Sequence, residues 1–149
     1  EIEQIGRPPI KGIDKDYYFL QPVYDTKGII YSPVENNKVM IRSIIGKDTC
    51  IKLIDRAKNC KKDEALNEKI HPSRYDEMVK SQDVIQLMHL VRALFNIKND
   101  RAKELRRMKS ADNRMLATAR KLLYGEIAAA MNEDYTAMSE QMDNYLSVL

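Results

Sequence analysis

The spacing of hydrophobic residues along the chain changes its period once, close to Gly46. Before this point, short runs alternate polar with apolar residues or are rich in aromatic and β-branched residues, which is typical of β-strands. We therefore predict strands in EIEQI (1–5), YYFLQPV (17–23) and GIIYSPV (28–34), and a further short strand in KVMIRSI (38–44). The Gly- and Pro-rich segment 6–16 and turn-forming residues at 25–28 and 35–37 separate them.

One of these strands should lie at an edge of the predicted sheet. Pro33 has no N–H with which to extend a β-ladder, so its strand should end there or border the sheet. The sheet is small and begins at Glu1, so we expect it to be incomplete at its N-terminus, as in a truncated chain. An open edge can pair with another chain, which makes a strand-swapped dimer conceivable.

From Asp48 onward the apolar residues recur at helical spacing. Pro72 suits the first turn of a helix, and Asp83 suits a cap position. We predict about five helices, which cover residues 48–58, 72–81, 84–95, 110–131 and 134–149. The polar stretch 58–69 is predicted to be a linker or surface loop, and the basic stretch 96–109 to fray or bend.

The longest predicted helix is SADNRMLATARKLLYGEIAAAM (110–131). Ser110 is a suitable N-cap, and Asp112 falls in the first turn, where a negative charge favours the helix dipole. Arg114 and Lys121 are seven residues apart and should share the side away from the core. The side expected to face the core carries Met115, Leu116, Ala119, Leu122, Leu123, Ile127 and Ala130.

These elements predict an α+β protein with a small antiparallel β-domain at residues 1–45 and an all-α domain at residues 46–149. Hydrophobic residues make up 44% of the 149-residue chain, enough for a core. The net charge of +3 is unevenly distributed. Ten Lys or Arg and three acidic residues lie between Arg92 and Lys121, whereas five acidic residues and no Lys or Arg follow from Glu126 onward. This asymmetry indicates a surface for nucleic acid or another polyanion, with a solvated charged face as the alternative.

Few residues are arranged for catalysis or metal binding. Cys50 and Cys60 suit two reduced thiols, and His71 and His89 are not accompanied by other spaced ligands. No signal peptide or membrane-spanning run is present, which favours a cytoplasmic protein. Glu126 lies on the apolar side of its helix, so we expect a structural bond to Arg74, Tyr75 or Arg92.

Three segments together resemble a known family. RMLATARKLLYGEIAAA (114–130), SRYDEMVKSQDVIQLMHLVRAL (73–94) and KGIDKDYYFLQPV…YSPVENN…IRSII (11–45) resemble CarD/CdnL-type bacterial transcription regulators. The resemblance implies that the β-domain is Tudor-like and binds the RNA polymerase β subunit. It also implies that the helical domain contacts promoter double-stranded DNA at the upstream edge of the transcription bubble and stabilises the open complex. Members of the family are not enzymes and use no cofactor.

The resemblance also assigns residues. The edge strand that pairs with polymerase would contain Ile29, Ile30, Tyr31, Ser32 and Pro33, with Tyr31 where the family often has Arg. His71 stands where the family tends to have a Trp that wedges into the minor groove. Arg92 and Arg114 fall where the family presents cations to DNA. With the basic cluster, the predicted DNA contacts are His71, Arg74, Arg92, Lys98, Arg101, Arg106, Arg107, Lys109, Arg114 and Lys121.

The predicted function is therefore that of a nucleoid-associated transcription regulator without a cofactor. Contacts made only in the open complex would stabilise that state. The alternative is a protein-interaction module that makes no direct DNA contact. An enzyme is disfavoured, because neither a nucleophile elbow, nor a phosphate-binding Gly-rich loop, nor a helical pair of carboxylates occurs in the sequence.

Overall fold

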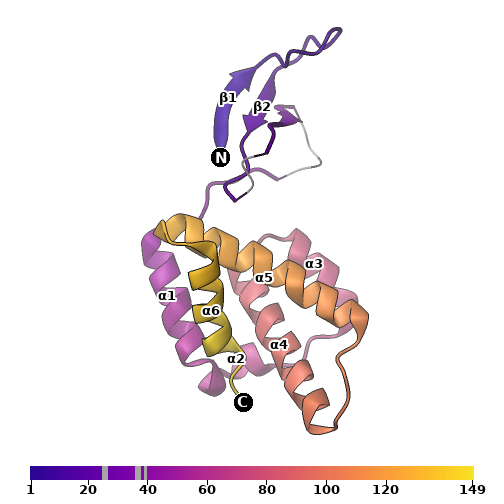
Figure 1. Ribbon diagram of the computed structural model, residues 1–149, viewed down its shortest axis with the longest axis vertical. Coiled ribbons are helices and arrows are strands. Elements are labelled where there is room, and N and C mark those ends of the chain that lie inside the picture. The colour runs from indigo at the N-terminus through magenta and orange to yellow at the C-terminus, as the bar shows by residue number, and fades with distance from the viewer. Residues whose placement is uncertain (25–26, 36–37, 39) are drawn as a thin grey trace. The chain divides into compact units, whose positions relative to one another are not determined.

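The computed structural model of the chain describes residues 1–24, 27–35, 38 and 40–149. Its contacts group the chain into two compact units, residues 1–43 and residues 44–149, which we call the β unit and the helical unit. Figure 1 shows the strands in the first unit and the helices in the second. The fold class is α+β, as the change of hydrophobic period predicts.

The β unit contains one three-stranded antiparallel sheet with the order β1-β2-β3. Its three strands confirm three of the four predicted strands. They are β1 (Ile2–Gly6), β2 (Tyr17–Leu20) and β3 (Ile30–Pro33). Strand β3 lies at an edge of the sheet and ends at Pro33, as predicted. The strand predicted at 38–44 is wrong for the described residues, because residues 40–46 are irregular and pair with none of the three strands. The turns predicted at 25–28 and 35–37 lie partly outside the described residues.

The β unit buries little of its own surface. Pro8 is the only buried residue among those described in the unit, and the side chains of β2 are half-buried. One ring pair lies across two strands, where Phe19 and Tyr31 meet edge to face with centroids 4.9 Å apart. Several large apolar side chains remain exposed, namely Ile2, Ile5, Ile10, Val23, Tyr24, Ile29, Ile30, Val34, Met40 and Ile41. Exposed large apolar side chains are characteristic of interaction sites where they gather into a patch.

The helical unit contains all five predicted helices and one more. They are α1 (Lys47–Lys58), α2 (Glu64–Asn67), α3 (Tyr75–Lys80), α4 (Val84–Lys103), α5 (Ser110–Met131) and α6 (Tyr135–Leu146), with 3₁₀ turns at Cys60–Lys62 and Pro72–Arg74. Asp83 and Asp134 cap α4 and α6 by accepting backbone N–H bonds, as short acidic side chains do at N-caps. Ser110 is the first helical residue and Lys109 the N-cap, because the chain is still extended at Lys109.

Helices α4 and α5 form the centre of the helical unit (Figure 1). Helices α2 and α3 pack on α4, whereas α1 and α6 pack on each other and on α5. The buried face of α5 includes Leu116, Ala119, Leu123 and Ile127, as its spacing predicts. Leu122 is 42% exposed, contrary to the prediction, because Leu123 takes the place in the core and turns its neighbour outward.

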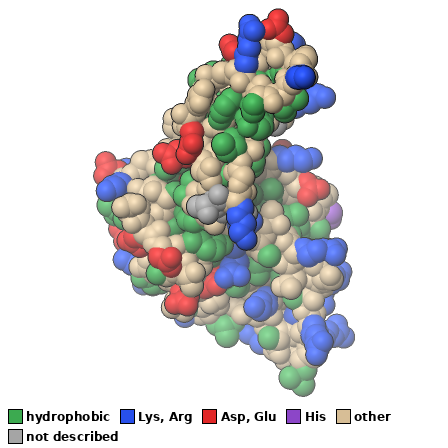
Figure 2. Space-filling view, turned by 45° about the horizontal axis from the view of Figure 1, so that its top comes forward, with side chains coloured by type: hydrophobic (Ala, Val, Ile, Leu, Met, Phe, Trp, Pro, Cys, Tyr) green, Lys and Arg blue, Asp and Glu red, His purple; other side chains and the backbone are tan. Residues whose placement is uncertain are grey.

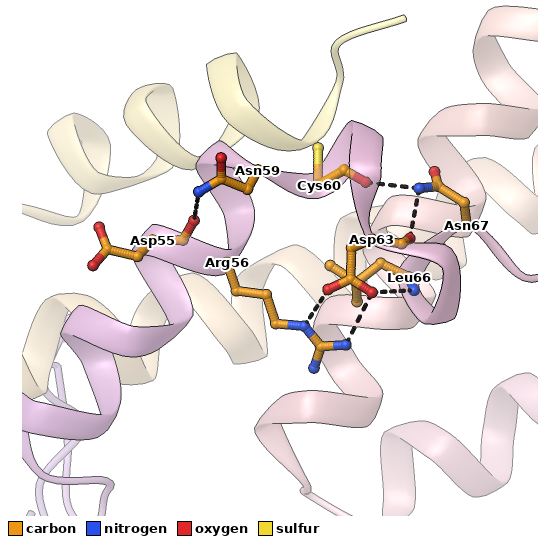
Figure 3. A network of polar contacts seen from close by, with 7 residues as sticks. All are labelled: Asp55, Arg56, Asn59, Cys60, Asp63, Leu66 and Asn67. Carbon is orange, nitrogen blue, oxygen red and sulfur yellow. Dashed lines mark hydrogen bonds and ion pairs between the residues drawn. The ribbon is translucent and has the colours of Figure 1, made fainter.

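The segment 58–69, predicted as a linker, is instead built into the core by polar contacts. Cys60 and Leu66 are buried, and Asp63 caps α2 through the backbone N–H of Leu66 at 3.0 Å. Figure 3 shows Arg56 from α1 reaching the same Asp63 carboxylate, with its Nε 2.6 Å from Oδ2. Asn67 donates to the Cys60 and Asp63 carbonyls, both at 2.7 Å. The segment 58–69 therefore contains a short helix, α2, which its polar composition did not predict and which side-chain hydrogen bonds stabilise.

We expect the Arg56–Asp63 pair to make the helical unit sensitive to acid. Arg56 lowers the pKa of Asp63 below 3.8 in the folded state, so the stabilisation is complete above pH 3.8 and is lost as the pH falls through the folded pKa. Asp63→Asn should lower the unfolding free energy by about 1–2 kcal/mol at pH 7. Thermal unfolding measured from pH 7 to pH 2.5 should show the two curves converging below pH 3.8.

Asp55→Asn is the matched control for this prediction. Asp55 bridges Lys58 at 3.4 Å, but its side chain is 63% exposed, so the substitution should change the melting temperature little. A stability difference between wild type and Asp63→Asn that persists unchanged at pH 2.5 would contradict the electrostatic origin of the effect.

Candidate nucleic-acid interface

The outer face of α5 is an exposed stripe that carries two cations and no acidic residue. Its members recur at positions that bring them to one side of the helix, and all are exposed; we call Asn113, Arg114, Ala117, Thr118, Lys121 and Leu122 the α5 outer face. Arg114 and Lys121 are about 10 Å apart along the helix axis. Neither side chain forms an ion pair with any residue that the structure describes. Both cations are therefore available to an external anion.

A second pair of predicted residues lies next to the start of α5. His71 and Arg74 are exposed and belong to the 3₁₀ turn that leads into α3. The His71 side chain accepts from the backbone N–H of Ser73 at 3.3 Å, so the ring orders this turn. Tyr75 follows directly, and burial raises the pKa of its hydroxyl, an effect to which the Asp112 carboxylate of α5 adds. Tyr75, the residue that follows this turn, is therefore near enough to the first turn of α5 to be affected by the Asp112 charge.

The remaining predicted cations surround the connection between α4 and α5. Lys98 and Arg101 lie on the second half of α4, and residues 104–109, which we call the basic loop, carry Arg106, Arg107 and Lys109. Arg106 lies 3.7 Å from Glu104 in an exposed pair. The others form no ion pair within the described part of the chain. Figure 2 shows Lys and Arg side chains gathered toward the lower right of the helical unit, whereas the acidic side chains in this view lie mainly on its left.

Arg92, predicted to contact DNA, is a structural residue. Its side chain is 4% exposed and lies in the core of the helical unit. Nε donates to the side chain of Asn67 at 3.0 Å, and Nη1 donates to the carbonyls of Leu146 at 2.8 Å and Val148 at 2.6 Å. These carbonyls end α6, which has no basic residue in its last turn. Arg92 therefore supplies the positive charge that a helix C-terminus favours.

Glu126 also has a different partner from the predicted ones. Its Oε1 accepts the backbone N–H of Ile45 at 3.0 Å, which ties the entry of the helical unit to α5. Arg92 is committed to other acceptors, and the buried Tyr75 hydroxyl forms no hydrogen bond within the described residues. Burial raises the pKa of the Cys50 thiol, and the nearby Glu126 charge adds to this effect.

A third polar cluster, which was not predicted from the sequence, removes one cation from the surface. Arg120 forms an ion pair with Asp143 of α6, and its Nε donates to Oδ1 at 2.9 Å. The Tyr124 hydroxyl donates to the same carboxylate at 2.9 Å, and burial raises the pKa of that phenol. The spacing of four between Arg120 and Tyr124 places both on one side of α5, which was the available signal.

A comparison with protein families agrees with this architecture. The model described as CarD, C-terminal domain, matches residues 52–143. The match begins within α1 and ends within α6, and it covers more than half of the chain. The chain belongs to the CarD family. This confirms the resemblance inferred from the sequence, and the CarD family is one of transcription regulators.

In this CarD-family chain, the strand β3 has no further strand beside it within the described part of the β unit. The Val34 N–H bonds to the Asp16 carbonyl at 3.0 Å. In an antiparallel ladder, residues that bond to the neighbouring strand alternate with residues whose backbone groups face away from it, so this bond shows which residues of β3 bond to β2. Ser32 is two residues away and pairs in the same way with β2. The backbone N–H and carbonyl of Tyr31 therefore point to the outer edge, where a further strand could add.

The described residues contain neither a candidate metal site nor a helix that could span a membrane. No group of three or more His, Cys, Asp and Glu side chains in them is arranged to hold a metal ion. Among the helices that the structure describes, none combines the length and the apolar composition needed to cross a bilayer.

Proposed function

We propose that this CarD-family protein binds the RNA polymerase β subunit through its β unit and promoter double-stranded DNA through its helical unit, and that it thereby stabilises the open promoter complex. The observation that carries the DNA-binding part is the α5 outer face, where Arg114 and Lys121 stand exposed, without acidic neighbours on that face and without ion pairs within the described residues. Cations of this kind contact phosphates and bind DNA with little sequence preference.

The neighbouring basic residues extend this proposed surface. Arg74 lies on the 3₁₀ turn beside the start of α5, and the basic loop leads into the same helix. Lys109 occupies the N-cap without a side-chain hydrogen bond to the first turn, so the N–H groups there can donate hydrogen bonds to a phosphate. Arg92 and Arg120 are excluded from this surface, because internal hydrogen bonds and an ion pair hold them.

The polymerase-binding part of the proposal rests on the β unit. Ile29, Ile30, Tyr31, Ser32 and Pro33 form or flank the edge strand β3, and exposed apolar side chains surround it. An extended segment of a partner can add to such an edge through backbone hydrogen bonds. The mechanism is a shift of population: contacts that exist only when the promoter is open lower the free energy of that state.

The test is binding of the full chain to RNA polymerase, with and without a promoter fragment, across a salt series. Polymerase binding that gains affinity with DNA, and loses the gain as salt rises, is the expected result. Polymerase binding without any gain from DNA would replace this proposal with the alternative, a protein-interaction module that makes no direct DNA contact. No binding to polymerase would overturn the proposal for the β unit.

Two substitutions of one residue isolate the backbone contact at the edge. Tyr31→Pro removes the outward N–H and the ring, whereas Tyr31→Ala removes the ring alone. If a strand adds here, Tyr31→Pro should weaken polymerase binding by a further factor of about 10 beyond Tyr31→Ala, since one hydrogen bond and its neighbours are lost. Circular dichroism of both variants checks that the sheet is retained. Equal affinities of the two variants would place the polymerase contact elsewhere.

A further inference from the structure

The basic loop carries one apolar side chain in an unusual position. Leu105 is 97% exposed, more than any other large apolar residue in the described part of the chain. It follows the C-terminus of α4 and has a φ of 56°, in the left-handed region. Its N–H bonds to the Ala102 carbonyl at 3.0 Å, and the N–H of Arg106 bonds to the Arg101 carbonyl at 2.8 Å. These two bonds form a Schellman motif, which fixes the backbone of Leu105.

Nothing in the fold of the helical unit favours Leu at this position. The left-handed residue of a Schellman motif is usually Gly, and sometimes Asn, because a Cβ is unfavourable there. The other non-Gly residues with positive φ in the described chain are Gln82 and Asn132, both polar. Leu105 is also absent from the hydrophobic core and its partly buried margin. A strained residue that is almost fully exposed and lies outside the core of the described residues points to a contact outside the chain.

The surroundings of Leu105 are cationic. Lys103, Arg106, Arg107 and Lys109 lie within four residues of it and are exposed, against the single acidic residue Glu104. Lys103 lies 3.2 Å from Asp100, and Arg106 lies 3.7 Å from Glu104. Both ion pairs are exposed, so water and salt weaken them. The loop therefore combines a projecting apolar tip with a positively charged base. Apolar side chains flanked by cations are used to enter the DNA stack, where the cations hold the phosphates on either side.

We propose that Leu105 is a wedge that inserts between base pairs of duplex DNA, while the cations of the basic loop hold the adjacent phosphates. This inference rests on the proposed DNA-binding function and adds a residue for it. A protein partner is the less favoured occupant, because a single leucine amid cations lacks the contiguous apolar area of a protein contact. The wedge requires partial unstacking of one base step, and the left-handed backbone holds the side chain clear of α4 for this purpose.

The experiment uses the full chain and duplexes that carry 2-aminopurine at successive steps, because this base fluoresces more strongly when it is unstacked. Wild-type protein should raise the fluorescence at one or two steps. Leu105→Gly removes the wedge, keeps every cation and suits the left-handed backbone, so its melting temperature should not fall below that of wild type. Its affinity should be about tenfold lower and its fluorescence change lost, whereas the slope of affinity against salt should stay unchanged.

Leu105→Met and Ile51→Ala complete the design. Met is apolar and flexible, so Leu105→Met should retain most of the fluorescence change. Ile51 is an exposed apolar residue on α1, 49% exposed, and Ile51→Ala should leave the change intact. Equal fluorescence for wild type and Leu105→Gly on DNA that both bind would overturn the wedge and leave the proposed function standing. Weaker polymerase binding by Leu105→Gly with unchanged DNA binding would also overturn it. Wild-type protein that binds no DNA would refute the proposed function and the wedge together.

Discussion

Replacing both cations of the α5 outer face, Arg114→Glu with Lys121→Glu, is expected to weaken duplex DNA binding by about 100-fold at low salt. Each substitution removes one phosphate contact and adds a repulsive charge at the same place. The slope of log affinity against log salt should fall by about 2, since two fewer counterions are released. Fluorescence anisotropy with a labelled promoter fragment, measured at several salt concentrations, gives both quantities.

The fold should not suffer from this double substitution. Both side chains are exposed, and the structure gives neither an ion pair within its described residues, so the melting temperature should stay within a few degrees of wild type. Polymerase binding in the absence of DNA should also be retained, because the β unit is unchanged.

Lys52→Glu with Lys61→Glu is the matched control. Both lysines are exposed in the helical unit, outside the α5 outer face and the basic loop, and the control reaches the same net charge. It should lose only the weak, long-range part of the attraction to DNA. If the control weakens DNA binding as much as the test variant, the affinity depends on net charge alone, and the α5 outer face is not the contact surface.

The periodic elements of this fold could be predicted from the sequence, because their signals are local. Asp83 and Asp134 precede apolar residues at helical spacing, and both are the N-caps of long helices. Pro33 indicated an edge strand, and β3 is one. The short helix α2 was missed because its segment is mostly polar and its stability comes from side-chain bonds, namely the Asp63 cap and the bond from Arg56 of α1 to the same carboxylate. The predicted strand at 38–44 failed because a β-branched composition does not supply a partner: among the described residues, 40–44 pair with no strand of the sheet.

The candidate site was predictable only in part. The outward side of α5 follows from the helical spacing of its apolar residues. Whether a given cation is exposed or bonded internally depends instead on which acceptors the tertiary fold brings near it. Arg120 meets Asp143 from α6, and Arg92 meets the end of the same helix. For Arg92 a local signal did exist, because it follows Val84 and Met88 at a spacing of four within an apolar run. A cation on a buried stripe needs internal acceptors, and this consideration would have removed it from the predicted DNA contacts.

Arg92→Met is expected to be the most destabilising single substitution considered for the helical unit. It removes three hydrogen bonds and leaves the carbonyls of Leu146 and Val148 without their donor at the end of α6. Hydrogen bonds from a charged donor and buried groups left unpaired each contribute, so the unfolding free energy should fall by about 3–5 kcal/mol. For a unit of this size the melting temperature should fall by roughly 15–25 °C. Calorimetry measures this directly.

Two further variants show which interactions of Arg92 account for the lost unfolding free energy. Arg92→Lys keeps the charge at the end of α6, but one ammonium cannot reproduce both the Nε bond to Asn67 and the Nη1 bonds to the carbonyls, so about half of the loss should remain. Arg74→Met is the exposed control, and its melting temperature should change little, because Arg74 makes no side-chain bond within the described residues. Met is close to the hydrocarbon volume of Arg, so no large cavity complicates the comparison.

DNA binding separates the structural role of Arg92 from the role predicted from the sequence. Well below its melting temperature, Arg92→Met should bind duplex DNA with nearly the affinity of wild type, because a side chain that is 4% exposed reaches no phosphate. Arg74→Met should show the reverse, with normal stability and weaker DNA binding. A variant of Arg92 that keeps its full melting temperature but loses DNA affinity would show that this residue turns outward to DNA, and that the internal hydrogen bonds to α6 do not hold it.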